Sequence, residues 1–162
     1  MPLSKDPPPL DPLTKTVVVK CTSDKAFSTF VAKMDSWWPV AKYSASAIAG
    51  GTAKAIRVQA QKGGVILEVG SDGGEHLWGT ILSFNPSTDL SMEFHIPTPG
   101  EKTTGRSLVE ITFADLGDGR TRVDLNQSNW HAFGDRALGL RAGYLASWTA
   151  ILDGAFKDAC GG

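Results

Sequence analysis

Residues 133–159 read FGDRALGLRAGYLASWTAILDGAFKDA, and this stretch decides the fold. Apolar side chains and one arginine recur in it at spacings of three and four, which predicts one long helix with an apolar face. That face comprises Ala137, Leu138, Arg141, Tyr144, Leu145, Trp148, Ile151, Leu152, Ala155 and Phe156. Gly139, Gly143 and Gly154 each weaken an isolated helix by about 1 kcal/mol relative to alanine. Packing against the rest of the domain must therefore hold this helix.

A series of short strands precedes the helix. Turn residues such as glycine, asparagine and aspartate separate six segments that are typical of strands. We expect these strands over residues 54–61, 64–70, 76–84, 90–96, 106–116 and 121–130. Apolar and polar residues alternate in 90–96 and 109–113, so each of these stretches has one buried and one solvated face. The short connections predict antiparallel neighbours.

The N-terminal part adds one strand and one helix. The run TKTVVVKCT at 14–22 is rich in β-branched residues and predicts a strand. Thr22 or Ser23 then caps a helix over 24–34, which ends before Pro39 because proline disfavours helical geometry at the preceding residue. Residues 40–52 are expected to form a loop. The order of elements predicts an α+β fold, with helices on one side of a curved antiparallel sheet.

The composition fits one domain, which we place at 14–162 behind a proline-rich leader at 1–13. Sixteen Lys and Arg against 17 Asp and Glu give a net charge of −1, which argues against a nucleic-acid-binding surface. The sequence has no run of about 18 apolar residues that would span a membrane. The leader lacks the apolar stretch of a secretory signal, and the two distant cysteines are typical of free thiols in a reducing compartment. We therefore expect a cytoplasmic protein.

This layout resembles the helix-grip fold of the START-like (SRPBCC) superfamily, in which a curved sheet of about six to seven strands wraps a long C-terminal helix. From about Thr14 to Phe156 the chain resembles a family of homologues of the activator of heat-shock-protein-90 ATPase. The resemblance is to the bacterial single-domain members of that family. The stretches that carry the resemblance are Ala26-Phe27 with Phe30, Trp37-Trp38-Pro39, 64–68, Asp72-Gly73, 78–82, Asn85-Pro86 with Leu90, 119–125, Trp130, Arg141, Tyr144, Trp148 and Leu152. The resemblance implies the fold and, as one alternative, a chaperone partner.

Signatures of catalysis are few. His76, His95 and His131 have no His or Cys three or four residues away, so helix-spaced metal ligation is not indicated, and we expect them to be surface or structural. The glycine pairs do not form a phosphate-binding loop, and no nucleophile elbow occurs. We assign no catalytic residue, cofactor or metal ligand, and favour a protein that is not an enzyme.

Two charged residues lie on apolar faces. Glu68 shares its strand face with Ile66, and Arg141 lies on the apolar stripe of the last helix. A buried carboxylate or guanidinium needs a partner, so our hypothesis is that Glu68 and Arg141 both reach the space between sheet and helix. The alternative is that one or both extend to solvent along their apolar stems.

Five tryptophans make the chain rich in large aromatic residues. They are either core filler or the wall of an apolar cavity between the sheet and the long helix. Gln127 follows Val123 and Leu125 on one strand face, which directs its amide toward that cavity. The predicted ligand-binding residues are Trp38, Glu68, Trp78, Gln127, Arg141, Tyr144 and Trp148.

Three functions follow from these patterns. The first is a non-catalytic binding module for a small hydrophobic molecule, such as a lipid-like, polyketide or aromatic compound. The second, implied by the resemblance, is an activator that binds a heat-shock-protein-90-type chaperone. The third is a cyclase-like or hydrolase-like enzyme in which burial raises the pKa of Glu68 and makes it a general base.

Overall fold

In the computed structural model, which describes residues 10–101 and 105–161, seven antiparallel strands form one sheet in the order β1-β7-β6-β5-β4-β3-β2. The strands are β1 (Leu13–Val19), β2 (Ala53–Val58), β3 (Val65–Gly70), β4 (Glu75–Asn85), β5 (Asp89–Phe94), β6 (Ser107–Gly117) and β7 (Arg120–Ser128). From β2 to β7 each strand pairs with the next one in the sequence, and β1 adds to the sheet beside β7. The predicted strands are confirmed, and the leader's residues 1–9 lie outside the described residues.

The sheet curls around a concave face. The pairing register shifts within β2–β3, β3–β4 and β4–β5, and such bulges bend a sheet and increase its twist. Gly79 of β4 permits a close approach to β5, since a Cβ at that position would lie 1.7 Å from the Glu93 carbonyl oxygen. This curvature gives the C-terminal helix a trough to occupy.

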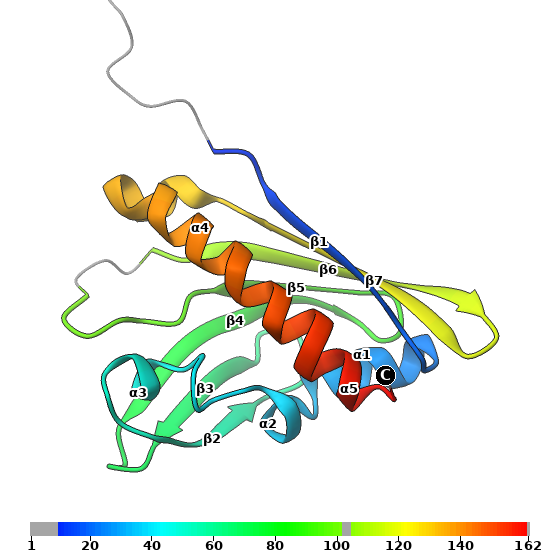
Figure 1. Ribbon diagram of the computed structural model, residues 1–162, viewed down its shortest axis with the longest axis horizontal. Helices are drawn as coiled ribbons and strands as arrows, with labels where there is room; N and C mark the ends of the chain where they lie inside the picture. Colours follow the sequence, from blue (N-terminus) through cyan, green and yellow to red (C-terminus); the bar gives the residue numbers. More distant parts are fainter. Residues whose placement is uncertain (1–9, 102–104, 162) are drawn as a thin grey trace, which may run out of the picture.

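The C-terminal helix lies across the concave face of the sheet (Figure 1). It starts as a 3₁₀ segment, η1 (Trp130–Arg136), continues as α4 (Ala137–Trp148), widens into the π-helical η2 (Thr149–Phe156) and ends in α5 (Lys157–Ala159). The predicted long helix and the helix-grip α+β fold are thus confirmed. The buried face is narrower than the spacing predicted, because Leu138 is 69% and Leu145 42% exposed.

Three short helices lie between the first and second strands in the sequence. Thr22 caps α1 (Ser23–Val31) by accepting a hydrogen bond from the Lys25 N–H at 3.2 Å. The expected helix over 24–34 breaks after α1, and a separate turn, α2 (Met34–Trp37), ends before Pro39 as predicted. The stretch 40–52, expected to be a loop, contains α3 (Ala45–Ile48).

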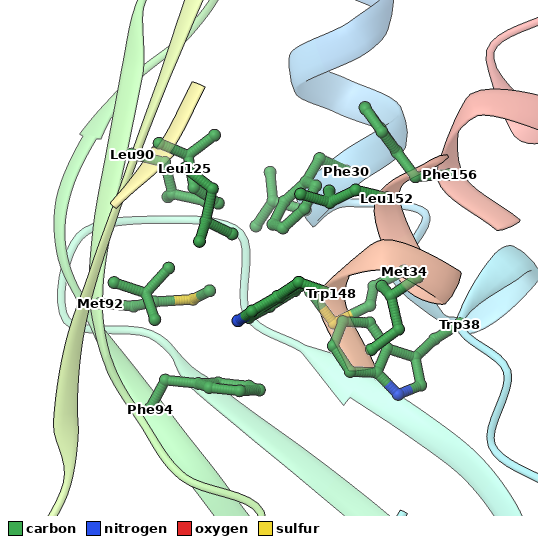
Figure 2. Packing of buried hydrophobic residues seen from close by; sticks show 14 of the residues in the cluster. Phe30, Met34, Trp38, Leu90, Met92, Phe94, Leu125, Trp148, Leu152 and Phe156 are labelled. Carbon is green, nitrogen blue, oxygen red and sulfur yellow. The ribbon is translucent and has the colours of Figure 1, made fainter. Parts of the chain in front are cut away.

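Aromatic residues fill the space between the sheet and the helices. Figure 2 shows Trp148 reaching from the C-terminal helix toward Met92 and Phe94 of the sheet, with Trp38 on its other side. The Trp38 ring centroid lies 5.9 Å from that of Trp148 and 5.2 Å from that of Trp78.

Among the described residues, no helix is both long and apolar enough to span a membrane.

Candidate functional site

A cleft of about 300 Å³ opens between α4, the segment 38–48 and the end of β5. Its wall is largely aromatic and aliphatic: Trp38, Tyr43, Ile48, Phe94, Ile96, Leu140, Tyr144, Trp148 and Ile151. A few polar side chains complete the lining: Lys42, His95, Thr98 and Ser147. An apolar concave surface with a few polar groups is the usual form of a small-molecule site.

Two glycines of α4 form part of the cleft surface. Gly139 and Gly143 are one helical turn apart, and a Cβ built on either meets no atom within 4 Å. The sequence pattern identified them only as weak points of the helix. In the structure they leave the helix backbone bare, so that a flat molecule can lie directly against it.

A chain of polar side chains borders the cleft. The Tyr144 hydroxyl oxygen accepts a hydrogen bond from the Ile96 N–H at 2.9 Å and lies 2.9 Å from His95 Nδ1. His95 Nε2 lies 2.8 Å from a carboxylate oxygen of Glu101. Glu101 also pairs with Arg136 and accepts from the Thr98 N–H. Tyr144 and His95 therefore connect the cleft to a buried carboxylate.

The protonation of this chain follows from its surroundings. Burial lowers the pKa of His95 below its ordinary value of 6.5, although Glu101 opposes that shift. Burial by itself raises the pKa of Glu101, but hydrogen bonds from Thr98, His95 and Arg136 outweigh it and leave the pKa below 4.5. Burial raises the pKa of the Tyr144 hydroxyl. At neutral pH the chain thus consists of a phenol, a neutral imidazole and a carboxylate.

Of the seven residues predicted to bind a ligand, Trp38, Tyr144 and Trp148 line the cleft. Trp78, Glu68 and Gln127 are fully buried and are not among its lining residues. Trp78 packs behind Trp38 and donates its indole N–H to Glu68 at 3.0 Å. The tryptophans thus divide between the cleft wall and the core, so each of the two expected roles is filled by some of them.

Glu68 faces inward as predicted, but its partners differ from the expected arginine. One carboxylate oxygen accepts from the Ala45 N–H at 2.7 Å and from Trp78, and the other accepts from the Ser46 N–H at 2.8 Å and the Ser46 hydroxyl. These donors hold the carboxylate at the start of α3. Glu68 thereby anchors the segment that forms one wall of the cleft.

Arg141 does not meet Glu68, and the hypothesis that they share the space between sheet and helix is wrong. Its guanidinium donates to the carbonyl oxygens of Asp11 at 2.7 Å and Pro12 at 3.1 Å. The segment that enters β1 passes beside this side of α4 and supplies the acceptors. Arg141 therefore fastens the end of the leader to the helix.

Gln127 ties the helix to the sheet from beneath the cleft. Its amide oxygen accepts from the Trp148 indole N–H at 2.8 Å, and its amide nitrogen donates to the Ser107 hydroxyl at 2.8 Å. Ser107 in turn donates to the Phe94 carbonyl at 2.6 Å. The amide points to the interior, but it does not reach the cleft as expected, because the Trp148 indole occupies its oxygen and Gln127 is not a lining residue.

Sequence reasoning missed His95, Glu101 and the glycine surface. Alternation along 90–96 placed His95 on the solvated face, yet its exposed fraction is 4%. One signal was present, since a tyrosine on an apolar helix face needs a partner for its hydroxyl.

In the described part of the chain, no group of three or more His, Cys, Asp or Glu side chains is placed to hold a metal ion.

No protein-family model matches the chain, and no curated protein matches it. Solved structures match it over most of their length. The self-sacrificing resistance protein CalC from Micromonospora echinospora is 26% identical with a TM-score of 0.65, covering 91% of this chain and 92% of its own. The anthrahydroquino-γ-pyrone synthase Txn09, complexed with SUM, is 24% identical with a TM-score of 0.59, covering 95% and 99%.

A third similar structure is the Aha1 dimer from Colwellia psychrerythraea. It is 16% identical with a TM-score of 0.63, covering 93% of this chain and 96% of its own. Together with the sheet order and the C-terminal helix, these likenesses show the START-like fold that the sequence resembles.

Proposed function

We propose that this START-like chain is a binding protein that holds a flat apolar or aromatic molecule in the cleft beside α4. The observation that carries the proposal is the pairing of an aromatic wall with a bare helix surface. Trp38, Phe94 and Trp148 supply ring faces, and Gly139 and Gly143 leave open space at the helix surface in the same lining. Aromatic rings bind other rings by stacked or edge-to-face contacts.

The size and the charge of the cleft narrow the ligand class. A cavity near 300 Å³ lies at the small end of the usual range for ligand sites, which favours a fused bicyclic ring system over a long lipid. Lys42 is the charged side chain of the lining and is exposed at its rim. Naphthalene and its simple derivatives are therefore suitable probes.

The other two functions have less support. Glu68 is engaged by four hydrogen-bond donors and does not line the cleft, which argues against its use as a general base. A chaperone partner stays a prediction from the sequence, because the likeness to the Aha1 dimer at 16% identity is a likeness of fold. Neither alternative explains the open glycine surface.

Indole N–H resonances provide a direct test by two-dimensional ¹H–¹⁵N NMR. Trp38 and Trp148 line the cleft, whereas Trp37, Trp78 and Trp130 lie outside its lining. Titration with naphthalene should shift the two cleft resonances and leave the other three nearly unchanged. Equal shifts of all five, or no shift at any attainable concentration, would refute the proposal.

A pair of glycine variants separates binding from folding. Gly143→Leu fills the cleft, yet it should keep or raise the thermal stability, because leucine favours a helix by up to about 1 kcal/mol over glycine. Naphthalene binding should be lost. Gly154→Leu is the matched control, since a Cβ there also meets no atom within 4 Å and the residue lies outside the cleft lining. Loss of binding in both variants would contradict the assignment of the site.

A further inference from the structure

The direction of each hydrogen bond along Tyr144, His95 and Glu101 follows from the chemistry of the three groups. An ionised carboxylate only accepts hydrogen bonds, so His95 Nε2, 2.8 Å from Glu101, must carry a hydrogen. A neutral imidazole has one N–H, which leaves Nδ1 without a hydrogen. The Tyr144 hydroxyl lies 2.9 Å from Nδ1 and must therefore donate its hydrogen to it.

These directions determine what Tyr144 has left to offer. Its hydrogen is directed to His95, and one oxygen lone pair takes the Ile96 N–H at 2.9 Å. What remains on the phenolic oxygen is acceptor capacity. Tyr144 is also part of the cleft wall, among side chains that are mostly apolar. A ligand that supplies a hydroxyl hydrogen matches this oxygen, whereas a ligand that supplies only an acceptor does not.

We propose that Tyr144 is the specificity-determining residue of the cleft, and that His95 and Glu101 orient its hydroxyl so that it accepts a hydrogen bond from a phenolic ligand. This inference rests on the proposed binding function and deepens it. The favoured ligand is a fused aromatic compound that carries a free hydroxyl group. Its methyl ether or the bare hydrocarbon binds more weakly.

Protonation of His95 reverses the preference. In the imidazolium form Nδ1 bears a hydrogen and donates to the Tyr144 oxygen, which releases the tyrosine hydrogen toward the cleft. Tyr144 then favours a ligand acceptor such as an ether oxygen. The charged groups that act on His95 are Glu101, which favours protonation, and Arg136 and Arg106, which oppose it. Lys42 is a further charged side chain in the lining of the same cleft.

The test compares 1-naphthol, 1-methoxynaphthalene and naphthalene by isothermal titration calorimetry. At mildly alkaline pH the wild-type protein should bind 1-naphthol about tenfold more tightly than the methyl ether, since one buried hydrogen bond has that effect. In Tyr144→Phe the ratio of 1-naphthol affinity to methyl-ether affinity should fall to the value set by the hydrocarbon surface alone. As the pH is lowered until His95 becomes protonated, the ratio of 1-naphthol affinity to methyl-ether affinity in the wild-type protein should fall and then invert.

A second variant keeps the test decisive if Tyr144→Phe is unstable. In His95→Asn the amide oxygen can accept the tyrosine hydrogen in place of Nδ1, and it does not titrate. This variant should therefore keep the preference for 1-naphthol and lose its pH dependence. His76→Asn, on β4 and outside the cleft lining, serves as the control and should behave as wild type.

The outcomes distinguish the two proposals. Equal affinity of the wild-type protein for 1-naphthol and its methyl ether at all pH values, with naphthalene still bound, would overturn the role of Tyr144 and leave the binding function standing. Absence of binding by all three compounds would overturn both. An unchanged ratio in Tyr144→Phe would also overturn the role of Tyr144.

Discussion

Replacing Glu68 with glutamine should destabilise the protein by roughly 3 kcal/mol, although the two side chains have nearly the same shape. The carboxylate receives two donors on each oxygen: Ala45 N–H and Trp78 Nε1–H on one, Ser46 N–H and the Ser46 hydroxyl on the other. A glutamine amide does best with its NH₂ group toward Ser46, because the Ser46 hydroxyl can rotate and accept from it, whereas the Ala45 N–H and the Trp78 indole N–H cannot accept. The bond from the Ser46 N–H is then lost, and the bonds that remain lose their charge assistance in a fully buried site.

The magnitude follows from the lost bond and the lost charge. A hydrogen bond to a charged group contributes about 1.5 kcal/mol or more, and a neutral acceptor gives less, so losing one bond outright and the charge assistance of the others costs roughly 3 kcal/mol. For a domain of this size the change lowers the melting temperature by roughly 10 °C. Because the affected bonds anchor α3, the segment 38–48 should loosen as well, and the cleft should lose one of its walls.

Urea denaturation followed by tryptophan fluorescence measures the free energy of unfolding. Glu75→Gln is the matched control, because Glu75 is an exposed glutamate on the neighbouring strand and its change should be nearly neutral. If the stability of Glu68→Gln stayed within about 0.5 kcal/mol of the wild type, the Glu68 carboxylate would not be the anchor of α3.

Three further predictions concern titration, thiol burial and backbone contact. Stability to urea should fall as the pH drops below 6.5, because the folded state holds His95 neutral while the unfolded chain binds the proton. Glu101, whose pKa is also lowered in the folded state, should add a second loss of stability below pH 4.5. A series of urea titrations at decreasing pH checks this, and constant stability through both windows would contradict it. Cys160 is fully buried and burial raises the pKa of its thiol to about 12, so iodoacetamide should modify it only in unfolded protein, as peptide mass spectrometry can show. Gly79→Ala would bring a Cβ within 1.7 Å of the Glu93 carbonyl oxygen and should cost about 3 kcal/mol or prevent folding, whereas a fully folded variant with wild-type melting temperature would exclude that contact.

The strands and the long helix were predictable because their signals are local. Glycine and asparagine mark the turns, and the spacing of apolar residues marks the helix. The same spacing placed Tyr144 and Trp148 on the apolar face of the helix, and both line the cleft. Their positions in the helix fix their faces independently of distant parts of the chain. Trp38 also lines the cleft, but it follows α2 in an extended conformation and was expected there only as an aromatic residue.

The polar part of the site depends on contacts between distant segments, which a single sequence does not reveal. His95 lies just beyond the end of β5, where the alternation of inward and outward side chains stops. Its partner Glu101 comes from the following loop, and Arg136 comes from the segment before α4. Arg141 was placed with Glu68 because both lie on apolar faces, but its acceptors are backbone carbonyls of the segment before β1. Backbone acceptors leave no side-chain signal in a sequence.

The strand order has a consequence for how the chain folds during synthesis. Strands β2 to β7 form a meander, so each can pair with its predecessor as soon as it leaves the ribosome. The first strand is the exception, since Leu13 lies opposite Gln127 and Val19 opposite Thr121. It must remain unpaired until β7 has been made. Among the strand pairs of this sheet, β1 and β7 are the farthest apart in the sequence, so their pairing raises the contact order most. The slowest folding step should therefore be the joining of β1 to β7, and a protein that stalls before it exposes the open edge of β7 as a template for aggregation.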